Sequence, residues 1–179
     1  MAEILQKEDP VLRKTAKEVS LEDIGSKKID KILAEMTGTL ESCEDGVALA
    51  APQIGESIRV FVVSPRAFQI SRNEEVKDGL KKEADKLIYI NPVITKRSVR
   101  KVTLDEGCLS VRHIFGKIKR HQKVTIEAYD ENGQKFIRGA SGLLAEIFQH
   151  ETDHLNGILF IDSAEDLIKM MEKKTEHVK

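Results

Sequence analysis

The 179-residue chain has few aromatic residues, no tryptophan and only two cysteines. Aromatic side chains make up 4% of the sequence, too few for a platform on which nucleic-acid bases stack. Lys and Arg number 29 against 30 Asp and Glu, so the net charge is −1 and no positive excess is present to bind DNA or RNA. No apolar run approaches the ~18 residues of a membrane span. We therefore expect neither a DNA-binding protein nor a membrane protein.

Length and composition favour one globular domain over residues 1–179. A chain of this length, with 40% apolar and 33% charged residues, can bury one sizeable core under a solvated surface. Residues 1–10 are acidic where a secretory signal would be basic and then apolar. We expect a cytoplasmic protein, in which Cys43 and Cys108 are free, buried, catalytic or metal-bound rather than paired.

Hydrophobic periodicity predicts an α+β fold, with antiparallel or mixed strands in the middle of the chain and helices on either side. Apolar residues at spacings of three and four predict a helix over residues 24–42. The turn signal Asn132-Gly133 predicts a hairpin. Strands are expected at residues 59–63, 87–90, 123–129 and 135–138.

Two further helices are expected in the last third of the chain. Ser141 is expected to cap a central helix whose apolar stripe covers residues 143–155 and which ends at Asn156-Gly157. A C-terminal helix is expected from about Ala164. The expected core is therefore strands packed around the central helix.

Between these elements, three segments are expected to be irregular or exposed. The polar stretch 66–86 is expected to be a surface excursion with a short helix near 81–86. Asn91-Pro92 is expected to bend the chain after the second strand. The basic run 117–121 is expected at a solvated strand edge.

Residues 150–154 read His-Glu-Thr-Asp-His, an H-E-x-x-H pattern inside the expected central helix. Histidines four positions apart project from one face of a helix, so both imidazoles can reach one ion. Glu151 lies where it can hold a water at that ion. The pattern also occurs by chance, but two imidazoles near an apolar face need a polar partner, and a metal ion supplies one.

A catalytic site of this kind needs a third protein ligand and one open position. The metzincin position, six residues after the second histidine, is Phe160, which excludes that arrangement. The gluzincin arrangement, with a downstream glutamate, stays open through Glu172 and Glu176. Cys108 is the other strong candidate, because Gly107 beside it permits an unusual backbone that presents a thiolate. The remaining candidates are Cys43, for which a core position is favoured, His113 and His121.

Three sequence blocks, in this order, resemble the signature motifs of bacterial peptide deformylases. They are GVALAAPQ at 46–53, EGCLS at 106–110 and QHETDHL at 149–155. The segment 90–92 and the hairpin at 129–133 also look like family features. The resemblance implies an α+β, metal-dependent hydrolase that removes the formyl group from N-formylmethionine at the start of nascent polypeptides.

The resemblance also implies a role for individual positions. Glu151 would be the general acid/base for an attacking water that the ion activates. Gln53 and the backbone N–H of Leu109 would bind the developing oxyanion. The implied metal ligands are Cys108, His150 and His154. The implied substrate-binding positions are Gly46, Val47, Ala48, Leu143 and His150.

One divalent ion is the expected cofactor, and two imidazoles with one thiolate suit Zn²⁺ or Fe²⁺. The resemblance implies Fe²⁺ in the cell, with Zn²⁺, Ni²⁺ or Co²⁺ as substitutes in purified protein. N-formylmethionyl nascent peptides are the expected partners. The lysines from Lys169 onward leave open a contact with the ribosome near the exit tunnel. The competing hypotheses are an H-E-x-x-H metalloprotease with a downstream glutamate ligand and a ribosome-binding module without activity.

The chain departs from the family pattern at positions that bear on specificity. Ala48 stands where the family usually has glycine, so its methyl group narrows the approach of a substrate backbone. Arg112 stands where many relatives have proline. Glu146, one turn before the first histidine, stands where relatives carry arginine or an apolar residue. At the pocket mouth it would alter the preference for charged residues downstream of Met; on a solvated face it would not. By match to the family, Arg120 is expected to pair with Glu106 and hold the cysteine loop.

Overall fold

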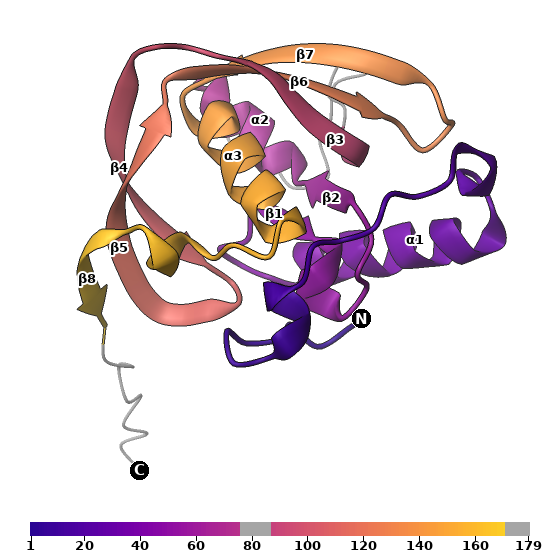
Figure 1. Cartoon of the computed structure of the whole chain (residues 1–179), viewed down its shortest axis with the longest axis horizontal. Helices are drawn as coiled ribbons and strands as arrows, with labels where there is room; N and C mark the ends of the chain where they lie inside the picture. The colour runs from indigo at the N-terminus through magenta and orange to yellow at the C-terminus, as the bar shows by residue number, and fades with distance from the viewer. Residues whose placement is uncertain (76–86, 171–179) are drawn as a thin grey trace.

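The computed structural model describes residues 1–75 and 87–170 of the chain. Figure 1 shows helix α3 in the middle of the molecule, with strands β3, β6 and β7 on one side of it and β4 and β5 on another. In chain order the elements are η1 (Pro10–Arg13), η2 (Leu21–Asp23), α1 (Lys27–Glu41), β1 (Ala48–Ala50), η3 (Ala51–Ile54), β2 (Val60–Val63), α2 (Pro65–Ser71), β3 (Ile88–Arg97), β4 (Lys101–Cys108), β5 (Val111–His121), β6 (Lys123–Tyr129), β7 (Lys135–Ser141), α3 (Leu143–Leu155), η4 (Phe160–Asp162) and β8 (Glu165–Lys169).

The strands form two antiparallel sheets, which confirms the predicted α+β class. The large sheet has five strands in the order β1-β2-β3-β6-β7, and the small sheet has three in the order β4-β5-β8. Strand β1 is an edge of the large sheet, paired with β2 from Ala48↔Val63 to Ala50↔Phe61. Helix α3 contacts strands of both sheets, so residues on α3 can meet residues from either one.

At strands β1 and β2 the large sheet is buried on both faces. Along β2, Phe61 and Val63 join the apolar cluster that includes α3, whereas Val60 and Val62 join the cluster that includes α1. Successive side chains of a strand point to opposite faces, which is why this short strand is apolar throughout. The rings of Phe61 and Tyr89 stack at 4.6 Å, so the few aromatic residues of the chain are concentrated where burial contributes most.

Several predicted elements are confirmed with adjusted ends. Helix α1 begins after Ser26, whose hydroxyl accepts a hydrogen bond from the Ile29 N–H at 3.4 Å. The β6–β7 hairpin turns at Gly133, which has φ 73°. Asp130 closes that turn, because its carboxylate accepts from the Asn132 and Gln134 N–H groups at 3.0 and 2.9 Å. Helix α3 ends at Leu155, as the Asn-Gly signal predicts.

The prediction that Ser141 caps α3 is wrong. Ser141 is the last residue of β7, and Gly142 occupies the cap position with φ 56° and no side-chain hydrogen bond. A left-handed backbone is cheap for glycine, so a sharp strand-to-helix turn, rather than a hydroxyl cap, starts this helix.

The prediction of a C-terminal helix from about Ala164 is wrong over Glu165–Lys169, which form strand β8 against β5. Its residues are exposed, including Leu167 and Ile168, so no buried helical face forms there. The open edge of the small sheet offers unpaired backbone groups, and this segment pairs with them. The rest of that predicted helix, 171–179, lies outside the described residues, and α3 is the most C-terminal α-helix of the described part.

Two other segments differ from expectation. The stretch 66–86 does not start as a surface excursion, because helix α2 buries Ala67 and Phe68 fully. Its remainder at 76–86, with the short helix predicted near 81–86, lies outside the described residues. Asn91-Pro92 does not end its strand, because β3 continues through a register shift after Ile90, with Asn91 at φ 50°. The bend is therefore a β-bulge.

Candidate active site

Helix α3 and the end of β4 bring three potential metal ligands together. His150 and His154 lie one turn apart on α3, and Cys108 is the last residue of β4. Their ligating atoms all lie within 4.8 Å of one another, with the Cys108 Sγ 3.2 Å from the His154 Nε2. This spacing fits one ion with three protein ligands and a position left for water or substrate.

Burial sets the protonation of the two imidazoles, and for His150 the neighbouring Cys108 and Glu106 act against it. Burial lowers the pKa of His154 well below its ordinary value, so this ring is neutral, as a ligand must be. Burial also opposes a charge on His150, but hydrogen bonds with Cys108 and Glu106 outweigh it and raise the pKa of His150 well above its ordinary value. The surroundings of His150 thus favour positive charge, which a divalent cation would bring.

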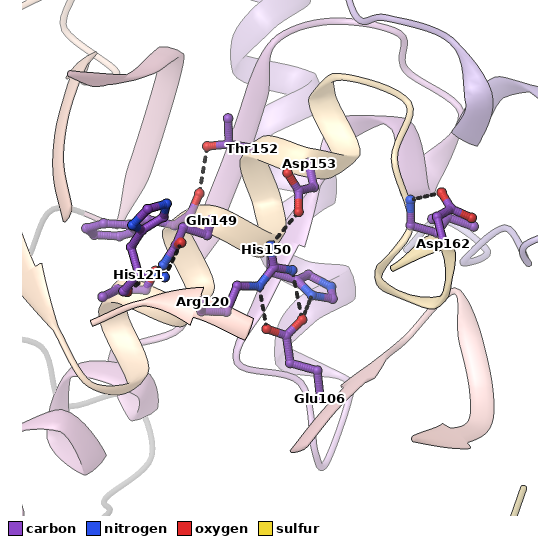
Figure 2. A network of polar contacts seen from close by, with 11 residues as sticks. Glu106, Arg120, His121, Gln149, His150, Thr152, Asp153 and Asp162 are labelled. Carbon is purple, nitrogen blue, oxygen red and sulfur yellow. Dashed lines mark hydrogen bonds and ion pairs between the residues drawn. The ribbon is translucent and has the colours of Figure 1, made fainter. Parts of the chain in front are cut away.

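A buried ion pair holds the first histidine in place (Figure 2). Arg120 donates from Nε and Nη2 to the two oxygens of Glu106 at 2.6 and 2.9 Å, and from Nη1 to Asp153 at 2.6 Å. The second oxygen of Glu106 lies 3.0 Å from the Nδ1 of His150. A proton held on Nδ1 leaves the Nε2 lone pair free to bind a metal. The expected pairing of Arg120 with Glu106 is confirmed.

Glu106 stays ionised although it is buried. Burial alone would raise the pKa of Glu106, but hydrogen bonds from Arg120 and His150 lower it to about 2. The same contacts raise the pKa of Arg120 despite its own burial. The Glu106–Arg120 pair therefore stays charged across the physiological pH range. Through the bond from Arg120 to Asp153, it joins β4, β5 and α3 at one point.

Glu151 directly follows His150 in the sequence, and it is buried with 4% exposure. Burial raises the pKa of Glu151 to about 7. Its Oε2 atom has no hydrogen-bond partner among the described residues. A buried carboxyl oxygen without a partner costs free energy unless a water or ligand binds it. A carboxyl group that titrates near neutrality can both accept and return a proton.

Gln53 is oriented toward the thiol by its neighbours. Its Oε1 accepts the Ala50 N–H at 2.8 Å, which turns the amide NH₂ toward Ser110 Oγ at 3.1 Å and Cys108 Sγ at 3.6 Å. The Ser110 N–H also donates to that sulfur at 3.4 Å. Sequence reasoning gave Ser110 no role of its own, although this residue ends the EGCLS block, two residues after the cysteine. Leu109, which lies between Cys108 and Ser110 in the sequence, lines the adjoining pocket.

A pocket of about 760 Å³ adjoins these residues. The expected substrate-binding positions Gly46, Val47, Ala48, Leu143 and His150 all line it. So do Arg112 and Glu146, two of the departures from the family pattern, together with Asp45, His113, Ile147 and Phe115.

Gly107 makes room for a neighbouring ring and does not adopt a left-handed backbone. Its φ is not positive, but a Cβ at this position would lie 2.7 Å from the ring of Phe115. The ring therefore packs on the backbone beside Cys108, where a register shift between Gly107 and Cys108 ends the regular β4–β5 pairing. The irregular backbone expected beside Cys108 is present as this register shift, and the reason for the glycine is corrected.

The other candidates for the third ligand do not join the cluster. Among the described residues, the group that could hold an ion contains Cys108 but not Cys43, His113 or His121. Cys43 instead donates its thiol to the Thr39 carbonyl at 3.3 Å. The downstream glutamates at positions 172 and 176 lie outside the described residues.

Comparisons with known proteins agree on one family. The family model described as "Polypeptide deformylase" matches residues 1–170. Peptide deformylase 2 of Clostridium acetobutylicum is 38% identical over 169 residues, which cover 94% of this chain and 99% of that protein. A crystal structure of peptide deformylase from Thermotoga maritima aligns with a TM-score of 0.75 and 33% identity, over 92% of this chain and 98% of that one.

Plant relatives are longer. Peptide deformylase 1A, chloroplastic/mitochondrial, of Arabidopsis thaliana is 38% identical over 164 residues, which are 90% of this chain. The chain spans 61% of that protein and 59% of its chloroplastic counterpart from Solanum lycopersicum.

Proposed function

The chain belongs to the polypeptide deformylase family, and from this premise we propose that it hydrolyses the formyl group from N-formylmethionyl peptides, giving formate and a free α-amine. One observation carries the proposal. Cys108, His150 and His154 converge, and the first two of them line a pocket large enough for a peptide end together with Glu151.

The edge strand beside the pocket supports the binding of an extended peptide. Strand β1 pairs with β2 along one side only, and Gly46, Val47 and Ala48 line the pocket. A peptide can add to such an edge as a further strand, so that backbone hydrogen bonds bind it whatever its sequence. Leu143 and Ile147 offer an apolar wall on α3 for the methionine side chain.

The proposed ligands of the divalent ion are Cys108, His150 and His154, with Fe²⁺ as the cellular metal and Zn²⁺, Ni²⁺ or Co²⁺ as substitutes after purification. When bound, such an ion supplies a Lewis acid and lowers the pKa of water toward neutrality. The thiolate and the two imidazoles suit these borderline metals better than Mg²⁺ or Ca²⁺.

Two groups of the chain would handle the proton and the developing charge. Glu151 takes a proton from the attacking water and returns it to the amide nitrogen as the C–N bond breaks, a role worth ~10²–10⁴ in rate. The Gln53 amide and the Leu109 N–H would stabilise the negative charge on the formyl oxygen. Because the Ala50 N–H holds the Gln53 carbonyl, the amide donors need little reorganisation during the reaction.

The cytoplasm is the proposed location, and N-formylmethionyl nascent peptides are the proposed partners. No helix of the described residues is long and apolar enough to cross a membrane. A contact with the ribosome near the exit tunnel is a separate proposal. Co-sedimentation with purified ribosomes at physiological salt tests it, and recovery of the protein only in the supernatant would refute it.

Anaerobic turnover of formyl-Met-Ala-Ser, scored by the new amine, tests the proposed function. The matched variants are Cys108→Ala and Cys43→Ala, because the second removes a thiol that lies outside the ligand cluster. We expect the Fe²⁺-loaded wild type and Cys43→Ala to be active, and Cys108→Ala to lose both bound metal and turnover. No wild-type turnover after loading with Fe²⁺, Ni²⁺ and Co²⁺ would overturn the proposal. Metal binding and peptidase activity that survive Cys108→Ala would favour the metalloprotease with a downstream glutamate.

A further inference from the structure

One wall of the pocket carries a carboxyl group that the proposed reaction does not use. Glu146 lies one turn before His150 on α3, and both side chains line the pocket together with Leu143 and Ile147. The spacing of these four positions places them on one face of the helix. A charged side chain therefore stands between apolar neighbours on the face that a substrate must contact.

The Glu146 carboxyl has no partner in the described part of the protein. It forms no hydrogen bond or ion pair with those residues, while Arg120, a buried cation whose charge acts on it, is already engaged by Glu106 and Asp153. Partial burial, reinforced by the negative charge of Glu106, raises the pKa of Glu146 to about 7. An incompletely hydrated carboxylate without a counter-ion is a favourable contact for a cation that arrives with the ligand.

Charges elsewhere around the pocket divide into two sides. Asp45, beside β1, adds a second acidic group, whereas Arg112 and His113, at the start of β5, are basic. Beyond these two, a neighbouring hollow includes Lys7 and Lys169. Glu146 is thus an acidic position on α3 that faces a pocket whose arginine, Arg112, comes from the small sheet.

The distance of Glu146 from the ligands indicates which part of a peptide it would meet. One helical turn separates it from His150, about 6 Å along the axis. An extended peptide advances ~3.3 Å per residue, and its first and third side chains lie on the same side. With the methionine side chain against Leu143 and Ile147, we therefore place the second and third residues near Glu146. A lysine or arginine side chain from either residue is long enough to reach its carboxylate.

We propose that Glu146 is a specificity-determining residue that selects formyl peptides with a basic side chain at the second or third position. The inference rests on the proposed function, since it assumes that the formyl end lies at the ligand cluster. It names a substrate preference that arises from this chain's own pocket wall. An acidic side chain at the same peptide position would meet a like charge and would be disfavoured.

Two pairs of substrates test the proposal at about pH 8, where the carboxylate is mostly ionised. They are formyl-Met-Lys-Ser against formyl-Met-Glu-Ser, and formyl-Met-Ala-Lys against formyl-Met-Ala-Glu. For the Fe²⁺-loaded wild type we expect kcat/KM to favour lysine by roughly tenfold in at least one pair, mainly through KM. Glu146→Gln should bring that ratio close to one, and Glu146→Arg should invert it.

The control is Glu131→Gln, which removes the same charge from the exposed β6–β7 turn and should leave every ratio unchanged. An active wild type with equal kcat/KM in both pairs would overturn the proposal. So would a lysine preference that survives Glu146→Gln.

A binding measurement separates failure of this inference from failure of the proposed function. Calorimetry on the metal-loaded protein compares the unformylated peptides Met-Lys-Ser and Met-Glu-Ser, and Met-Ala-Lys and Met-Ala-Glu. If no formyl peptide is turned over, the proposed function fails and the binding ratios decide the inference. Tighter binding of a lysine peptide that Glu146→Gln abolishes supports it, and equal binding refutes it.

Discussion

The two sheets are stabilised by different forces, and the candidate site lies where they meet. The large sheet packs against α1 at β1 and β2 and against α3 on its other face, and both contacts are apolar. In the small sheet, most side chains of β4 and all of those of β8 are exposed or half-buried. Two of the buried side chains in the small sheet are Glu106 and Arg120, which form an ion pair.

This difference shows how the ligand cluster is held together. The histidines lie on α3, which is anchored in the large apolar core, whereas Cys108 lies on the small sheet. Arg120 spans the gap, because it bonds Glu106 on β4 and Asp153 on α3. Apolar packing therefore positions the imidazoles, and a buried polar network positions the thiol relative to them.

The largest expected effect separates the chemistry from the metal. Glu151→Gln should lower kcat by roughly 10²–10⁴ because the general acid/base is lost. Metal content should stay near that of the wild type, since all three ligands remain. The measurements are anaerobic turnover and metal analysis of the same preparation, set beside Cys108→Ala, which should lose both. Near-normal turnover by Glu151→Gln would refute the role of this carboxyl.

Removing the arginine tests the polar link between the small sheet and α3. Arg120→Met should destabilise the fold by roughly 3–5 kcal/mol, because Glu106 is left buried without its main partner. The double variant with Glu106→Leu should recover much of that stability. It should still bind metal about 10–100-fold more weakly, since His150 lacks its Nδ1 acceptor. Urea unfolding and competitive metal titration measure the two quantities, and normal metal affinity in the double variant would contradict the link.

A matched pair of phenylalanines compares the cores directly. Phe61 in the large sheet is fully buried, whereas Phe115 in the small sheet is 42% exposed. Phe61→Ala should cost roughly 3–5 kcal/mol of unfolding free energy. Phe115→Ala should cost about 1 kcal/mol or less and act mainly on KM, because its ring lines the pocket. Equal costs in urea unfolding would show that the small sheet is also held by apolar packing.

The smallest expected effect is a pH dependence of stability in acid. In the folded protein, the pKa of Glu106 is lowered from its ordinary value of 4.5 to about 2. Its charged form therefore adds stability that is fully present above about pH 4.5 and is lost as the pH falls through about 2. In metal-free protein, the fall in Tm from about pH 6 to about pH 2.5 should be smaller in Glu106→Gln than in wild type. If Tm falls equally with pH in wild type and Glu106→Gln, other groups cause the acid sensitivity.

Local patterns were sufficient for part of the fold. The apolar spacing in α1, the alternation in β6 and the Asn-Gly turn before β7 each act within a few residues. The same patterns failed for β8, whose residues are exposed on a sheet edge. They also failed for α2, where only two of the three buried residues are apolar. They also missed β4 and most of β5, because exposed strands of mixed polarity carry little periodic signal.

The sequence by itself determined the helix that carries His150, Glu151 and His154, and the motif blocks that resemble one family. Only the tertiary structure decided that Cys108, 46 positions before His154, lies 3.2 Å from it, and that Glu146 faces the pocket. The physical reason is the distance along the chain over which each kind of interaction acts. Helical spacing is set by backbone geometry over a few residues, whereas the approach of β4 to α3 depends on a sheet pairing and a buried ion pair between segments far apart in the chain.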